Sequence, residues 1–133
     1  MANEATLHFE THGPIQFAID EALAVEKGTL LVIIDPMKVS KHSTINQPIA
    51  GIAAEEHIAS TGKDKIAVYR EGIFRMTLSG GTVAGNALVG SATANKVSNS
   101  SGATEQFYVG TSFETAANSE TLLVELRPYS ISQ

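Results

Sequence analysis

The chain of 133 residues contains no cysteine and no tryptophan, and aromatic residues make up only 6% of it. Without cysteine there is no disulfide, no thiol nucleophile and no thiolate zinc site. Because large aromatic anchors are scarce, we expect a core built from Val, Ile, Leu and Ala. The hydrophobic fraction of 43% still predicts a folded chain, and the length suits a single modest core.

Long apolar runs and positive charge are also lacking. The longest apolar run, residues 30–34, is far shorter than the roughly 20 residues that span a bilayer. The first residues contain no basic stretch followed by an apolar one, so we expect no signal peptide, no membrane partner and synthesis in a cytoplasm. A formal net charge of −5 would not neutralise a run of phosphates, so we also expect no nucleic-acid partner.

Short segments with the pattern of β-strands run along the chain. Residues 66–68, 74–78 and 122–126 alternate between large apolar side chains and small or polar ones, and residues 29–34 form a run rich in apolar residues. Alternation with a period of two is typical of a strand that buries one face. Glycine-containing or polar turns separate these segments, so we predict an all-β fold, either a small β-barrel or a β-sandwich.

The domain organisation is predicted to be simple. We see no linker, no charge block and no internal repeat, so residues 18–133 are expected to form a single β domain. Gly51 lies inside the apolar segment 48–53, which indicates a bend or a close approach of two backbones. Residues 1–17, which contain Gly13-Pro14, are expected to form an extended N-terminal arm, with a frayed terminus as the alternative.

Motifs of catalysis are missing. The Gly-Lys pair at residues 62–63 lacks both ends of a phosphate-binding loop, and there is no Gly-x-Ser-x-Gly. His8 and His12 have helical spacing, but the Gly-Pro that follows them argues against a helix, and neither has the Glu partner of a helical zinc site. His57 follows two glutamates and could pair with one, although a solvated turn is the favoured interpretation. We therefore predict no enzyme, no cofactor and no metal.

The order of the segments resembles a known family, the tailed-phage capsid decoration (cement) proteins. The resemblance covers roughly residues 20–128 and is carried by five segments in sequence: residues 24–28, 49–56, 66–74, 80–88 and 122–128. It implies a compact β domain on the outer surface of the virion capsid, bound to the major capsid protein and commonly trimeric. Such proteins stabilise the expanded head and carry no catalytic residue.

Two sets of candidate site residues follow from this resemblance. The arm segment alternates and could add a strand to an edge of the shell protein; its capsid-binding residues would be Thr6, Leu7, His8, Phe9 and Glu10. A homotrimer would need an apolar patch, for which the candidates are Ile49, Ile52, Ile73 and Phe74. The alternative for these four residues is an ordinary place in the core.

Other functions remain open at this level. A tail, neck or head-fibre component would share the small β fold and the lack of catalytic motifs. A glycan-binding adhesion module would also be all-β, but it usually stacks sugars on exposed aromatic rings, and the chain has only three Tyr and five Phe.

Overall fold

The computed structural model describes residue 5 and residues 13–100 and 107–130. These parts contain ten β-strands and no helix, which confirms the all-β prediction. The strands are β1 (Ile15–Ile19), β2 (Leu30–Asp35), β3 (Lys38–Lys41), β4 (Ile49–Ala53), β5 (Lys65–Tyr69), β6 (Gly72–Ser79), β7 (Ala87–Gly90), β8 (Val97–Asn99), β9 (Phe107–Ser112) and β10 (Thr121–Ser130). The arm boundary expected at residue 17 falls inside β1.

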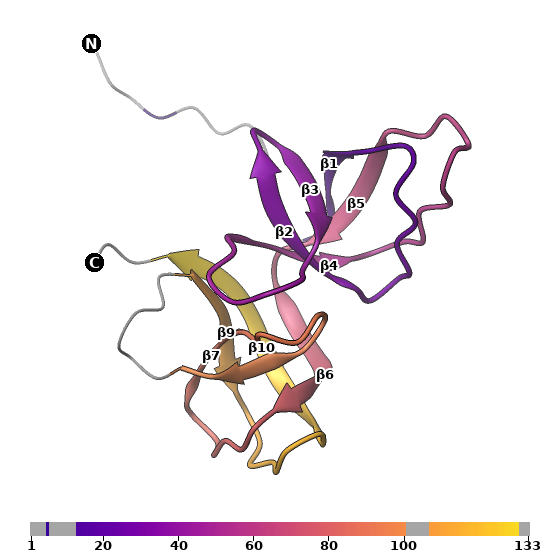
Figure 1. The fold of residues 1–133 in the computed structure, drawn as a ribbon. Helices are drawn as coiled ribbons and strands as arrows, with labels where there is room; N and C mark the ends of the chain where they lie inside the picture. The colour runs from indigo at the N-terminus through magenta and orange to yellow at the C-terminus, as the bar shows by residue number, and fades with distance from the viewer. Residues whose placement is uncertain (1–4, 6–12, 101–106, 131–133) are drawn as a thin grey trace.

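The strands close into two small barrels. Barrel 1 consists of β1–β5, in the order β1-β3-β2-β4-β5, and β5 pairs with β1 to close it. Barrel 2 consists of β6–β10, in the order β10-β6-β8-β7-β9, and β9 pairs with β10. Figure 1 shows barrel 1 in indigo to pink above barrel 2 in pink to yellow. The barrel alternative of the predicted fold is therefore the one adopted.

The two barrels are copies of one design. In each barrel the first and third strands pair in parallel and the other pairs are antiparallel. Each also carries one isolated antiparallel bridge at the same place, Val25 with His57 and Thr82 with Ala116. The expectation of no internal repeat is therefore wrong. The repeat escaped sequence analysis because equivalent positions share burial and backbone geometry more than residue identity.

The two barrels also share a glycine in the fourth strand, at which two backbones come close together. A Cβ at Gly51 would overlap the carbonyl oxygen of Tyr69, and a Cβ at Gly110 would overlap that of Glu125. The pairing of the neighbouring strand shifts register beside each of these glycines. The close backbone approach predicted at Gly51 is confirmed, and the same approach occurs once more in barrel 2.

A glutamate after the fourth strand ties each barrel to its last strand. Glu55 Oε2 accepts a hydrogen bond from the backbone N–H of Ala67 at 2.8 Å, and Glu114 Oε1 accepts one from Leu123 at 2.9 Å. Each carboxylate also has a basic partner, Lys63 at 2.7 Å for Glu55 and an arginine for Glu114. The loop that leaves the fourth strand is thus anchored in the same way in both barrels.

The barrels share apolar packing. One cluster fills barrel 1 and includes Leu31, Ala50 and Val68. A second cluster fills barrel 2 and continues onto the outer face of β2 and β4, where its members are Leu30, Val32, Ile49 and Ile52. Successive residues of a strand point to opposite faces, so β2 and β4 contribute to both clusters. This outer face of barrel 1 is therefore the surface on which barrel 2 packs.

Candidate functional site

The predicted capsid-binding segment lies outside the described residues. Thr6, Leu7, His8, Phe9 and Glu10 belong to residues 6–12, which the structure does not describe. What the structure places is the point where the arm enters the fold, at Ile15, the first residue of β1. The role of the arm therefore stays a prediction.

The four predicted trimer-contact residues do not form one patch. Ile49 and Ile52 are buried between barrels 1 and 2. Phe74 is half-buried against the same cluster, and its ring centroid lies 5.6 Å from that of Tyr69. Ile73, in contrast, is 60% exposed. Two of the four residues thus serve an interface within the chain, and Ile73 is the one that is open to a partner.

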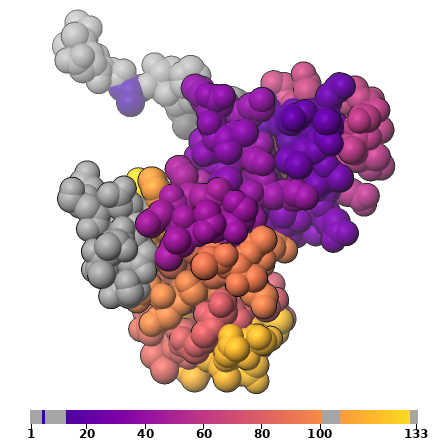
Figure 2. Space-filling view, in the orientation of Figure 1, coloured from indigo at the N-terminus to yellow at the C-terminus, as the bar shows by residue number. Residues whose placement is uncertain are grey.

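A polar junction completes the contact between the barrels. Asn95, in the turn between β7 and β8, accepts a hydrogen bond on Oδ1 from the backbone N–H of Leu30 at 2.8 Å. Its own backbone N–H donates to Nδ1 of His42 at 2.9 Å. In the space-filling view the magenta segment around residue 45 lies directly against the orange segment of barrel 2 (Figure 2). The exposed β7–β8 turn therefore lies against barrel 1 and is joined to it by these two hydrogen bonds.

His42 is buried at this junction, and burial lowers the pKa of its imidazole from the ordinary value of 6.5. Because Nδ1 accepts the hydrogen bond from Asn95, that nitrogen carries no proton. The ring is therefore neutral in the folded chain, with its proton on Nε2.

The equivalent turn of barrel 1, between β2 and β3, has a different character. Met37 occupies the position equivalent to Asn95, two residues before the valine that pairs with the first strand, and both have a positive φ, 52° and 60°. Met37 is 47% exposed, and Ile34, near the end of β2, is exposed as well. Asn95 is also exposed, but its side chain bonds to the other barrel. Barrel 1 therefore presents an apolar turn where barrel 2 has a polar contact. Sequence analysis missed this surface because nothing in the sequence marks the two turns as equivalent.

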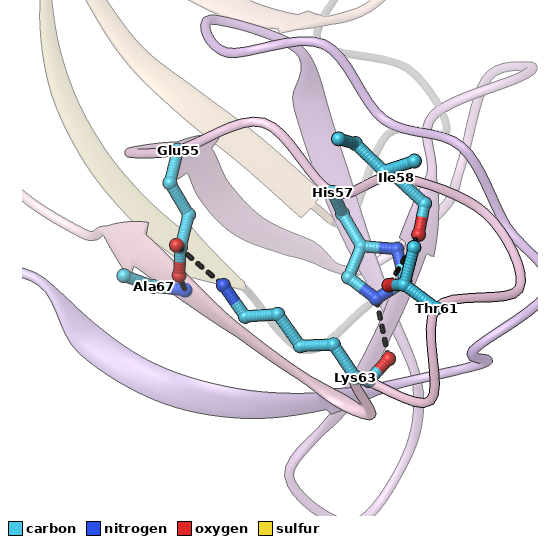
Figure 3. Close-up of polar contacts among 6 residues, drawn as sticks. All are labelled: Glu55, His57, Ile58, Thr61, Lys63 and Ala67. Carbon is cyan, nitrogen blue, oxygen red and sulfur yellow. Dashed lines mark hydrogen bonds and ion pairs between the residues drawn. The ribbon is translucent and has the colours of Figure 1, made fainter.

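The second histidine among the described residues is His57, which the sequence suggested could pair with a glutamate. The described residues contain no group of three or more His, Cys, Asp or Glu side chains that could hold a metal. The ring nitrogens of His57 contact the backbone carbonyl oxygens of Leu23 and Lys63 and not a carboxylate, so the pair considered from the sequence is not formed. Figure 3 shows the contact with Lys63. Lys63 and the Ala67 N–H hold the pKa of the Glu55 carboxyl below its usual value. Glu55 is thus engaged as a structural anchor.

No helix in the described residues is long and apolar enough to cross a membrane. One cleft on barrel 1, beside the junction, is lined by residues of mixed character, including Glu26, Lys41, Glu56 and Ile58. Its charged groups come from the β1–β2 and β4–β5 loops and from the end of β3. The cleft has no convergent set of groups that specifies a ligand.

Comparison with known proteins agrees with this picture. No curated protein matches the chain. A solved structure described as the head fibre gp8.5 N base of bacteriophage phi29 has a similar fold, with a TM-score of 0.54 and 11% sequence identity, over 90% of this chain and 98% of that one. The family model described as phage cement protein matches residues 4–128. The chain therefore belongs to the phage cement proteins and is a structural, capsid-associated component of a phage virion.

Proposed function

We propose that this protein binds the outer surface of the expanded head, contacts the major capsid protein there, and stabilises the shell without catalysing a reaction. The observation that carries the proposal is the family match over residues 4–128. The fold supports it: two barrels that share apolar packing provide a body that can bridge neighbouring shell subunits. Many copies of a weak clamp add avidity without any chemistry.

The test is to add the purified protein to expanded heads that lack it and to measure binding and shell stability together. We expect saturable binding, a copy number comparable to that of the major capsid protein, and heads that lose DNA at a higher temperature. Binding with no change in the release temperature would contradict the stabilising role. Failure to bind expanded heads would contradict the proposal as a whole.

A head-fibre component is the second candidate, favoured by the similarity to the phi29 head-fibre base. Quantitative mass spectrometry of purified particles separates the two. A ratio to the major capsid protein close to one favours decoration of the whole surface. A much lower ratio favours a fibre, neck or tail position.

For the contact with the shell we propose the N-terminal arm, whose residues Thr6 to Glu10 alternate in the manner of a strand that pairs with a sheet edge. Deleting residues 1–14 leaves β1 intact, because this strand begins at Ile15. We expect the truncated protein to keep its circular dichroism spectrum and lose binding to heads. Unchanged binding by the truncated protein would rule the arm out.

For self-association into a homotrimer we propose the exposed apolar residues of the two barrels, namely Ile34 near the end of β2, Met37 in the β2–β3 turn and Ile73 at the start of β6. Replacing each by Lys places a charge in a surface that association would bury. Light scattering is expected to show a trimer for the parent and a monomer for the triple variant. Ile58→Lys, at an equally exposed isoleucine on another loop, is the control, and loss of the trimer there as well would contradict the assignment.

A further inference from the structure

His57 is buried at the end of barrel 1 where three segments meet. Its side chain is 1% exposed, and its backbone forms the bridge with Val25, with N···O distances of 2.8 and 2.9 Å. The ring lies between the loop that precedes Val25 and the turn that leads into β5. Figure 3 shows it directed at the carbonyl oxygen of Lys63 in that turn. The two loops are also joined directly, since the Ser60 N–H donates to the carbonyl oxygen of Glu21 at 2.7 Å, and the ring adds a side-chain link between them.

Both ring nitrogens contact oxygens that can only accept. Nδ1 lies 2.6 Å from the carbonyl oxygen of Leu23, and Nε2 lies 2.6 Å from that of Lys63. A neutral imidazole has one N–H and one bare lone pair, whereas the imidazolium has two N–H donors. In the neutral form one lone pair would face a carbonyl oxygen at hydrogen-bond distance, which is repulsive. Only the doubly protonated ring satisfies both contacts.

We infer that His57 is held as an imidazolium and acts as a proton-dependent clamp, joining the loop of residues 20–25 to the turn of residues 58–64.

The charges around the ring suit a cation. Glu55 interacts electrostatically with His57 and is itself hydrogen-bonded to Lys63 and Ala67. The loop before Val25 carries Asp20 and Glu21, and the turn ends at Asp64. Glu26, Lys41, His42 and Glu56 line the cleft beside the ring. Carboxylates outnumber the lysines in this group.

Barrel 2 provides the internal comparison. Ala116 stands in the place of His57, and its backbone makes the same bridge, to Thr82, with N···O distances of 3.0 and 3.1 Å. The turn that follows is shorter, residues 117–120 in place of residues 58–64. Barrel 2 thus closes the same end with a shorter turn and without an imidazole side chain. The clamp belongs to the longer turn of barrel 1.

The direction of the pH effect follows from the two hydrogen bonds. Loss of the proton leaves the ring with one N–H donor for two carbonyl oxygens, so one of the two contacts must be released. We therefore expect the clamp to weaken with rising pH.

The first test is the two-bond ¹H–¹⁵N spectrum of the histidines in the full chain at pH 6.5. Replacing His8 and His12 by Gln leaves the signals of His42 and His57 alone. We expect two protonated-type nitrogens for His57 and one bare nitrogen for His42. A bare nitrogen in both rings would overturn the inference.

The second test is hydrogen exchange of the backbone amides of Val25 and His57 between pH 6 and pH 9, corrected for the intrinsic pH dependence. We expect protection at this bridge to fall at least tenfold, while protection of the Thr82 and Ala116 amides stays constant. Equal behaviour of the two bridges would overturn the clamp. In His57→Ala, which copies the barrel 2 residue, protection at Val25 should be low and independent of pH; if that variant does not fold, the comparison within the parent protein still decides.

Discussion

Barrels 1 and 2 have the same strand order and the same two fixed points, a glycine pressed against the last strand and a glutamate that anchors the loop after it. They differ in their loops. The β7–β8 turn of barrel 2 is hydrogen-bonded to barrel 1 through Asn95, while the equivalent turn of barrel 1 carries the exposed Met37. One end of barrel 1 is closed by a buried histidine and that of barrel 2 by an alanine. The repeated strands thus provide the body, and the loops distinguish one copy from the other.

The largest effect is expected where the barrels are most alike. Gly51→Ala and Gly110→Ala each place a methyl group on a carbonyl oxygen of the neighbouring strand, so each should destabilise the chain by more than about 3 kcal/mol or prevent folding. Gly81→Ala is the control, because the nearest atom to its Cβ lies at 3.7 Å. Urea unfolding measures all three, and a mild effect at only one of the two strand glycines would show that the copies are not equivalent there.

Next in size is a cavity in either core. Leu31→Ala in barrel 1 and Leu122→Ala in barrel 2 each empty a fully buried site and should cost about 2–5 kcal/mol. Since one cluster crosses between the barrels, we expect both variants to unfold in a single transition. Two separate transitions in urea, one shifted by each variant, would show instead that the barrels are independent domains.

The hydrogen bond from the β7–β8 turn to barrel 1 should contribute less to the free energy of unfolding than the core does. The equivalent turn of barrel 1 should contribute almost nothing. Asn95→Ala removes the acceptor of the Leu30 N–H, and an unsatisfied buried donor costs about 1–3 kcal/mol. Met37→Ala, at the equivalent exposed position, should change the free energy of unfolding of the monomer by less than about 0.5 kcal/mol. Equal losses of unfolding free energy in the two variants would contradict the conclusion that only the β7–β8 turn stabilises the contact between the barrels.

The smallest effect is one of pH. Burial lowers the pKa of His42, so the folded chain leaves it neutral while the unfolded chain binds a proton below about pH 6.5. Its contribution is present above that pH and is lost as the pH falls, the opposite direction to that of His57. Unfolding in urea at pH 8, 6.5 and 5, compared between the parent and His42→Gln, should show a weaker loss on acidification in the variant. An identical pH dependence would contradict a neutral His42.

Part of this architecture is encoded locally. The alternation at residues 66–68, 74–78 and 122–126 predicted three strands with the correct inward faces. The buried residues of these segments are Ile66, Val68, Met76, Leu78, Leu122, Val124 and Leu126. The position of Gly51 inside an apolar segment indicated a bend or a close approach of two backbones. The order of short segments indicated the family that the match over residues 4–128 then established. Each of these features depends on neighbours along the chain, which is why the sequence determined them.

The tertiary structure decided the rest, because the partners involved are far apart in sequence. Strand patterns in the sequence do not predict which strands pair, so they are compatible with one barrel or with two. The pairing of β5 with β1 and of β10 with β6 decides for two. Ile49 and Ile52 are apolar in either case, and only the position of barrel 2 makes them an internal contact. His57 acquires its role from the carbonyl oxygens of Leu23 and Lys63. The sequence determined where strands form and what they bury, and long-range pairing alone determined what those buried faces meet.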